Sequence, residues 1–302
     1  MGISSTKMIR YLIALSLFSS LLADETKPAP EKKSGLTALA EKLLGKDGGN
    51  RLFYYPTKTA PDVPSDFGHR FEDVTFKSED GTKLHGWFFQ PIEKVKPKGT
   101  VVFHHGNTGS VGYHIGFVGW MARAGYQVLL YDYRGFGKSE GEITRNGLVQ
   151  DARAAIIYAK SREDVDGKRI ISFGHSLGGA KSLAALGEKM IPGVRGVICF
   201  AGFASYEDMA KKVAGKMGAD LVTDELSARD LVEKISPIPV LIAHGTKDAV
   251  VPLAQGEILF KKAKEPKTIY RIPNGSHTRA LWMNDGEYRT KVLAWMGKTL
   301  KS

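Results

Sequence analysis

The most informative part of the sequence is SFGHSLGGA, residues 172–180. It holds a Gly-x-Ser-x-Gly pattern centred on Ser176. The apolar run RIISFGH leads into the serine and predicts a buried strand, and LGGAKSLAALGEKM follows as a helix-forming run. A strand, a one-residue turn and a helix together hold a serine in a strained conformation, at a point where strand and helix pass close to each other. We therefore expect Ser176 to be a nucleophile. We also expect Gly174 and Gly178 to be structural residues of this elbow, because a Cβ atom at either position would collide with the opposite element.

The same pattern occurs a second time in GKSEG, residues 137–141, centred on Ser139. Because the chain has 34 glycines, one chance match is unsurprising. No strand directly precedes this copy, and glycines and polar residues surround it, which is typical of an extended loop. Glu140 beside the serine would also oppose an oxyanion. The context therefore favours Ser176 as the nucleophile and Ser139 as a loop residue.

A serine nucleophile needs a base, and the base needs an acid that orients it. The apolar run PVLIAHG is followed by TKDAVVP, which places Asp248 in the loop after a predicted strand. The last predicted strand, KTIYRIP, is followed by NGSHTRALW, which places His277 in the next loop. Taken singly, Asp248 is also typical of a turn or helix cap, and His277 of a loop. In a fold with this elbow, the acid and then the base follow the serine along the chain, each in a loop after a strand. Asp248 and His277 meet both conditions, so we predict Asp248 as the acid and His277 as the base.

An oxyanion formed at the serine needs two N–H donors. Leu177, the residue after the nucleophile, supplies one at the start of a helix, and the loop after TVVFHHG supplies the other. Asn107 is the candidate in that loop, and Thr108 is the alternative. The other histidines beside these strands are interpreted as structural: His104, His105, His175 and His244.

The order of predicted elements indicates an α/β fold. FEDVTFKSEDG and TKLHGWFFQP alternate apolar and polar residues, as strands of an antiparallel hairpin do. Five later runs are continuously apolar, which suits parallel strands buried on both faces: TVVFHHG, YQVLLYDY, RIISFGH, GVICFAG and PVLIAHG. Helical segments are expected near 113–124, 145–161, 177–190, 254–264 and 282–299. The sequence thus predicts an antiparallel start and a parallel core with helices.

The composition is that of an ordinary globular protein, with 302 residues, 42% hydrophobic residues and 25% charged ones. The net charge is +11, but basic residues are scattered among acidic ones, so we expect a solvated basic surface and no nucleic-acid partner. Attraction to anionic membranes or acidic substrates stays open. Cys199 is the only cysteine and lies in an apolar run, which indicates a core thiol and no intrachain disulfide. The pattern of Cys and His residues predicts no metal site.

The N-terminus predicts a targeting segment. A basic start, MGISSTKMIR, is followed by the apolar run YLIALSLFSSLLA and a small residue at Ala23, which is typical of a signal peptide over residues 1–23. Leu21 departs from the small residue expected before a cleavage site, so an uncleaved membrane anchor is the alternative. Residues 24–50 are expected to be a polar linker with one short helix, LTALAEKLLG. These features predict an exported protein, secreted or periplasmic, or one anchored to the membrane.

From about residue 51 to 302 the chain resembles the α/β-hydrolase superfamily. The resemblance rests on HHGNTGSVG, YDYRGFGKSEG, FGHSLGGA, HGTKDAVVP and GSH. The HGN and DYRGFGKSEG phrases are similar to those of serine esterases related to acyl-protein thioesterases and membrane-associated hydrolases. The resemblance implies an eight-stranded, mostly parallel sheet with helices on both faces, and it implies no cofactor or metal. It also implies a small cap between strands 6 and 7, at about residues 203–237.

One feature of the predicted cap bears on the substrate. Met209, Val213 and Met217 are spaced four residues apart and predict an apolar stripe on one helix face. Such a stripe suits either a wall for an acyl group or ordinary packing on the core.

The predicted serine, histidine and aspartate indicate a serine hydrolase that cleaves carboxylic esters or thioesters through an acyl-enzyme on Ser176. Its substrate would be a small or lipid-like acyl ester. A serine peptidase on the same fold is the enzymatic alternative. A non-catalytic binding protein is the alternative from another class, because fold alone does not dictate function.

Overall fold

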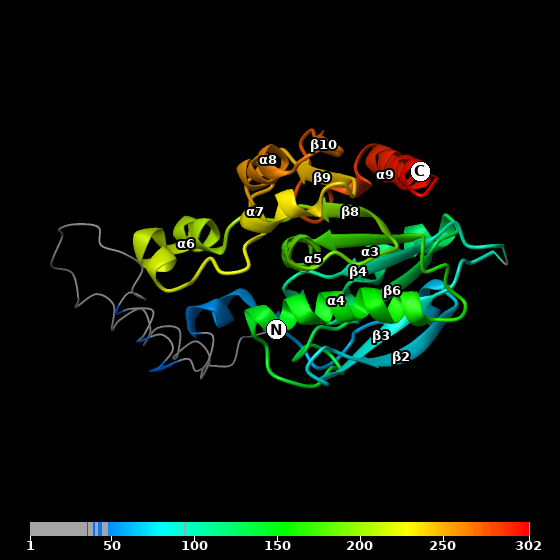
Figure 1. Cartoon of the computed structure of the whole chain (residues 1–302), viewed down its shortest axis with the longest axis horizontal. Coiled ribbons are helices and arrows are strands. Elements are labelled where there is room, and N and C mark those ends of the chain that lie inside the picture. The colour runs from blue at the N-terminus through cyan, green and yellow to red at the C-terminus, as the bar shows by residue number, and fades with distance from the viewer. Residues whose placement is uncertain (1–34, 36–38, 40–41, 44–47, 94, 302) are drawn as a thin grey trace. The chain divides into compact units, whose positions relative to one another are not determined.

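An eight-stranded sheet forms the centre of the fold, as predicted (Figure 1). A computed structural model describes residues 35, 39, 42–43, 48–93 and 95–301. The strand order is β10-β9-β8-β7-β4-β6-β3-β2. The strands are β2 (Phe71–Lys77), β3 (Lys83–Phe89), β4 (Thr100–His104), β6 (Gln127–Tyr131), β7 (Ile170–His175), β8 (Val194–Phe200), β9 (Val240–Gly245) and β10 (Lys267–Ile272). β3 pairs antiparallel with β2 and β6, and the other neighbours pair parallel, so the predicted antiparallel start and parallel core are confirmed.

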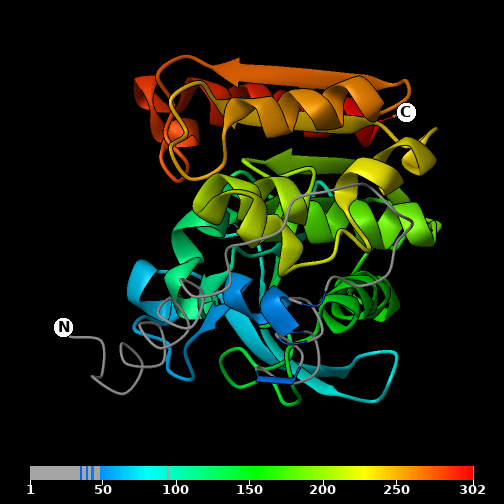
Figure 2. The same cartoon turned by 90° about the vertical axis from the view of Figure 1, so that its left-hand side faces the viewer.

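Helices cover both faces of this sheet (Figures 1 and 2). Successive strand residues point to opposite faces: Val102 belongs to one buried apolar cluster and Phe103 to the other. Helices α4, α5 and α8 pack on the first cluster, and α3 and α9 on the second. The helices are α3 (Ile115–Arg123), α4 (Arg145–Ser161), α5 (Leu177–Glu188), α6 (Tyr206–Asp220), α7 (Ala228–Leu231), α8 (Leu253–Lys262) and α9 (Glu287–Thr299). The single thiol, Cys199, lies inside the first cluster, where burial raises its pKa to about 12.

The closing helix begins later than the sequence predicts. Helix α9 starts at Glu287, and residues 280–286 form two short 3-10 turns instead. The reason is local, because Asn284, Asp285 and Gly286 all have positive φ angles, of 50°, 53° and 79°. Three successive left-handed residues cannot continue a right-handed helix.

The folded domain begins before residue 51, the predicted boundary with the linker. A 3-10 helix, η1, spans Gly48–Phe53, and its first three residues are buried. Asn50 accepts a hydrogen bond from Arg145 of α4 at 2.5 Å, and its side-chain amide donates to the hydroxyl of Thr223 at 3.5 Å.

Two short strands form a second sheet: β1 (Tyr55–Pro56) pairs parallel with β5 (Thr108–Gly109). Each has only two residues, which is too short for an alternating pattern to be recognised in the sequence.

Other sequence predictions lie outside the described residues. The predicted signal peptide, residues 1–23, is wholly outside them, and of the predicted linker helix only residues 39 and 42–43 are described, as helical. Among the described residues, no helix is both long and apolar enough to span a bilayer. The same part of the chain holds no group of three His, Cys, Asp or Glu side chains arranged for a metal ion.

Candidate active site

Ser176 lies at the sharp turn between strand β7 and helix α5. Its φ and ψ angles are 54° and −119°, a combination that costs a non-glycine residue about 1–3 kcal/mol. A hydrogen bond from its N–H group to the carbonyl of Phe200 (2.9 Å) holds the turn against β8. The serine is 7% exposed. The hydrogen bond to β8 thus helps to hold Ser176 in its strained conformation.

The two glycines that flank Ser176 permit this turn. A Cβ atom on Gly174 would come closer than 3.0 Å to the backbone of Gly178 and Gly179. A Cβ atom on Gly178 would come equally close to the backbone carbonyl of His104, at the end of β4. Real Cβ atoms essentially never approach other atoms so closely, so both positions require glycine in this backbone.

His277 and Asp248 converge on Ser176 from the loops after β10 and β9. His277 Nε2 lies 2.9 Å from Ser176 Oγ, and His277 Nδ1 lies 2.7 Å from Asp248 Oδ2. A carboxylate only accepts hydrogen bonds, so the ring proton is assigned to Nδ1. Nε2 then carries a lone pair and accepts the Ser176 hydroxyl proton. The three side chains form one chain of hydrogen bonds.

The Asp248 carboxylate is held on both oxygens. Oδ1 accepts hydrogen bonds from the N–H groups of Val250 (2.9 Å) and Val251 (2.8 Å). Oδ2 faces His277 and also lies 3.4 Å from Nε2 of His244. Burial by itself raises the pKa of Asp248, but the hydrogen bonds from His244, His277 and the backbone outweigh it and lower this pKa. Asp248 is therefore ionised at neutral pH.

The loops that carry Asp248 and His277 are joined by main-chain hydrogen bonds. The N–H group of Thr246 donates to the carbonyl of Ile272 (2.9 Å), and that of Lys247 donates to Gly275 (3.0 Å). Parallel pairing of β9 with β10 brings these strand ends together at one edge of the sheet. The relative position of acid and base is thus set by the backbone.

Of the predicted oxyanion donors, Leu177 follows the serine directly, and Asn107 follows a glycine that lies beside the serine. Leu177 is the first residue of α5, so its N–H group has no acceptor within that helix. Gly106 lies beside Ser176, since a Cβ atom added to it would be 3.8 Å from the serine Cβ. The next residue, Asn107, is fixed by its carbonyl, which accepts from Tyr55 (2.8 Å), and by its side chain, which donates to Phe53 (2.9 Å). Thr108, the alternative, is exposed and belongs to β5.

Comparison with known proteins identifies the family of this chain. The family model described as "Serine aminopeptidase, S33" matches residues 95–223. The uncharacterized protein YfhR of Escherichia coli O157:H7 is 37% identical over 249 residues, covering 80% of this chain and 85% of YfhR. The "Alpha/beta hydrolase domain-containing protein WAV2" of Arabidopsis thaliana is 30% identical over 265 residues, covering 80% of this chain and 85% of WAV2. The chain belongs to the α/β-hydrolase family.

Solved structures agree on the α/β-hydrolase fold. The esterase Pf2001 of Pyrococcus furiosus superposes with a TM-score of 0.67 at 20% sequence identity, covering 82% of this chain and 97% of the esterase. At that identity the likeness bears on the fold alone.

In this α/β-hydrolase the second Gly-x-Ser-x-Gly copy is a structural loop. Ser139 is 2% exposed, and its hydroxyl donates to the carbonyl of Asp132 (2.7 Å) while accepting from the N–H group of His85 (2.9 Å). The Asp132 carboxylate in turn accepts from the N–H group of Val111 (2.9 Å). The hydroxyl of Ser139 therefore joins the ends of β3 and β6 and has no histidine side chain as a partner.

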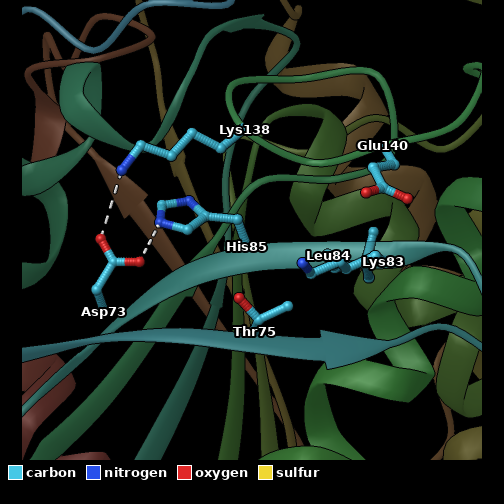
Figure 3. Close-up of a pocket in the computed structure, with 7 residues that line it drawn as sticks. All are labelled: Asp73, Thr75, Lys83, Leu84, His85, Lys138 and Glu140. Carbon is cyan, nitrogen blue, oxygen red and sulfur yellow. Dashed lines mark hydrogen bonds and ion pairs between the residues drawn. The ribbon is translucent and has the colours of Figure 1, made fainter.

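A polar cleft of about 250 Å³ lies over this loop (Figure 3). His85 and Lys138 both reach Asp73 in it, at 2.7 Å and 3.5 Å, and Glu140 lines its other end. Ser139 does not line the cleft, because it is buried beneath. The cleft thus holds paired charges, and the hydroxyl of Ser139 is not among the groups that line it.

The four histidines interpreted as structural divide into two groups. His104 donates and accepts within the sheet, with Tyr131 (2.8 Å) and Ser172 (2.9 Å), and burial lowers its pKa to about 3. His105 bonds the carbonyl of the next residue and is also buried. The other two contact the acid and base: His244 lies beside Asp248, and His175 lies beside His277. In the sequence, these contacts of His175 and His244 are indicated only by the position of both residues at the end of a predicted strand.

The segment between β8 and β9 contains α6, α7 and a 3-10 helix, η4 (Val232–Ile235). The predicted continuous stripe is wrong, because α6 is broken at Ala214 and at Gly215, whose φ and ψ are 59° and −150°. Met209 packs on the core, whereas Val213 is 84% exposed and Met217 is 37% exposed. The three side chains therefore do not share a helix face.

The first half of α6 contacts the loop that carries Asp248. Lys212 donates to the carbonyls of Ala249 (2.5 Å) and Val250 (2.9 Å). Gln255 of α8 accepts from the N–H groups of Ala204 and Ser205, just before α6. These contacts place the segment beside the loop that carries Asp248.

Proposed function

We propose that this α/β-hydrolase is a serine hydrolase that cleaves carboxylic esters or thioesters through an acyl-enzyme on Ser176. The observation that carries the proposal is the unbroken chain of hydrogen bonds from Ser176 through His277 to Asp248, with lengths of 2.9 Å and 2.7 Å. A serine hydroxyl is a weak nucleophile until a base of this kind removes its proton.

In the proposed first step, His277 Nε2 takes the Ser176 proton as Oγ attacks the acyl carbonyl carbon. The imidazolium that forms keeps its Nδ1–H bond to Asp248, whose negative charge stabilises it. The carbonyl oxygen becomes an oxyanion, which the N–H groups of Leu177 and Asn107 would bind. Its collapse releases the alcohol or thiol, which takes the proton from His277.

In the second step, water replaces the leaving group. His277 removes a proton from the water as its oxygen attacks the acyl carbon. The tetrahedral intermediate collapses, the Ser176 oxygen leaves and regains the proton, and the carboxylic acid is released. Each step uses the same base and acid, and none needs a metal or cofactor.

Turnover of short p-nitrophenyl esters by the full chain tests the proposal. Ser176→Ala should abolish turnover and labelling by a fluorophosphonate probe, because it removes the attacking oxygen. Ser139→Ala is the matched control, since it removes the other Gly-x-Ser-x-Gly hydroxyl, and its labelling should persist. Wild-type turnover in Ser176→Ala would refute the assignment.

A serine peptidase is the second candidate, and the description of the matching family model favours it. The same three side chains would then cleave an amide bond. Aminoacyl amides and acyl esters, compared at equal concentration, distinguish the two by kcat/KM. A chain that the fluorophosphonate probe does not label would instead support a binding protein on this fold.

The acyl group and the cellular location are the other parts of the proposal. A small or lipid-like acyl ester fits a chain predicted to be exported or membrane-anchored. Turnover of a series of esters and thioesters of increasing chain length tests which acyl group is preferred. Fractionation of cells that express the full chain, with and without residues 1–23, tests the cellular location.

A further inference from the structure

His175, the residue just before Ser176, is a buried side chain with a fixed orientation. It ends β7 and is 4% exposed. Its ring stacks on Phe117 of α3, with ring centres 4.5 Å apart and planes at 26°. The ring of Phe200, at the end of β8, also lies beside it, with its centre 5.1 Å from the centre of the His175 ring. Stacked aromatic neighbours restrict rotation of the ring, so its nitrogens point in defined directions.

One of these nitrogens contacts the main chain of His277. His175 Nε2 lies 3.2 Å from the backbone carbonyl oxygen of His277. A carbonyl only accepts, so the proton must be on Nε2, and Nδ1 carries the lone pair. In the described part of the chain Nδ1 has no hydrogen-bond partner. His175 is therefore a donor to His277 and to no other residue described.

Phe117, which stacks on His175, also contacts Trp282, five residues after His277. The ring of Trp282 packs edge-on against Phe117, with ring centres 5.1 Å apart. Phe117 in turn stacks on His175. Residues 277–282 are thus held at one end by the hydrogen bond from His175 and at the other end by the packing of Trp282 on Phe117.

We propose that His175 is a positioning residue, which sets the distance between His277 and Ser176 by holding the backbone carbonyl of His277. Neighbouring residues of one rigid turn contact the same histidine: His175 bonds its main chain, and Ser176 bonds its ring. The two bonds fix both the position and the direction of the base. The inference rests on the proposed function, because it gives His277 the role of base.

The charge state of His175 is consistent with this role. Burial, followed by the proximity of His277, holds the pKa of His175 well below its usual range. The ring therefore stays neutral when His277 takes up a proton. Because the ring centres are only 5.0 Å apart, a charged His175 would repel the imidazolium.

Two substitutions in the full chain separate the hydrogen bond from the packing. His175→Phe keeps an aromatic ring against Phe117 but removes the donor, and His175→Gln keeps a side-chain N–H donor. We expect kcat on a p-nitrophenyl ester to fall about 10- to 100-fold in the phenylalanine variant, because a displacement of the order of 1 Å costs up to about 100-fold. KM should stay within about twofold, since the bond is not to substrate. The glutamine variant should recover most of kcat.

Rates are expressed per active site titrated with the fluorophosphonate probe, so that loss of folded protein is not counted. His104→Gln is the control for a buried histidine without contact to His277. It should lower the melting temperature and leave the rate per titrated site unchanged. If His175→Phe does not fold, His175→Met replaces it as the variant without a donor.

Amide hydrogen exchange of residues 273–282 gives a second measurement that does not depend on turnover. Exchange should be faster in the variant without the donor and return toward wild type in His175→Gln. A wild-type rate per titrated site in His175→Phe, or equal defects in His175→Phe and His175→Gln, would overturn the inference, and so would unchanged exchange. An unlabelled, inactive wild-type chain would instead remove the proposed function, and the exchange result would still decide whether His175 holds the segment.

Discussion

The close approach of Gly178 to strand β4 predicts a large effect from the smallest possible substitution, Gly178→Ala. The added methyl carbon would lie closer than 3.0 Å to the backbone of His104 and His105. Side chains can rotate away from an intruding atom, but these obstacles are main-chain atoms at the end of the central strand β4 and of the residue after it. Either β4 or the start of α5 must therefore move.

The expected loss follows from that geometry. Overpacking a core costs about 1–3 kcal/mol, and a clash with backbone belongs at the upper end. For a domain of this size each kcal/mol lowers Tm by about 2–4 °C, so Gly178→Ala should lose about 6–12 °C. The shift also moves Ser176 relative to His277, and a displacement of the order of 1 Å costs about 100-fold in kcat.

Thermal unfolding followed by circular dichroism, and kcat on a soluble ester, measure the two effects. Gly297→Ala is the matched control, because a Cβ atom there meets nothing within 4 Å and the residue lies inside α9. It should gain about 0.5–1 kcal/mol, since alanine favours a helix over glycine. A Gly178→Ala variant that melts within about 2 °C of wild type, with wild-type kcat, would refute the reasoning.

Three further outcomes are expected. Asp248→Asn should lower kcat about 10⁴-fold near neutral pH, because the amide favours the wrong tautomer of His277; a loss below tenfold would contradict the role of Asp248. Ser139→Ala should destabilise the fold by about 1–3 kcal/mol in urea unfolding, because the N–H group of His85 and the Asp132 carbonyl lose a buried partner, while labelling of Ser176 persists; loss of labelling in folded protein would count against it. Burial lowers the pKa of His104 to about 3 in the folded state, so the unfolded chain binds more protons between that value and its ordinary pKa. The stability that His104 contributes is therefore fully present above about pH 6.5 and falls by about 1.4 kcal/mol per pH unit below it, which the difference between wild type and His104→Gln in urea unfolding at several pH values measures; a difference that stays constant between about pH 6 and 5 would refute it.

The fold class and the candidate serine, acid and base could all be predicted from the amino-acid sequence. Short local patterns decide these features, because a Gly-x-Ser-x-Gly between an apolar strand and a helix permits few backbone conformations. Asp248 and His277 could be predicted because each follows a strand of one parallel sheet, and the carboxyl ends of such strands share an edge.

Contacts between residues far apart in the sequence could not be predicted and are known only from the folded chain. The contact of His175 with the carbonyl of His277 joins residues 102 positions apart, and no local pattern encodes it. The bond between Asn50 and Arg145, which places the domain boundary before residue 51, is of the same kind. The break in α6 at Gly215 was not predicted, because the helical spacing of apolar residues continues on both sides of Gly215 in the sequence. Periodicity reports which residues could share a face, whereas the path of the backbone through packed neighbours decides whether they do.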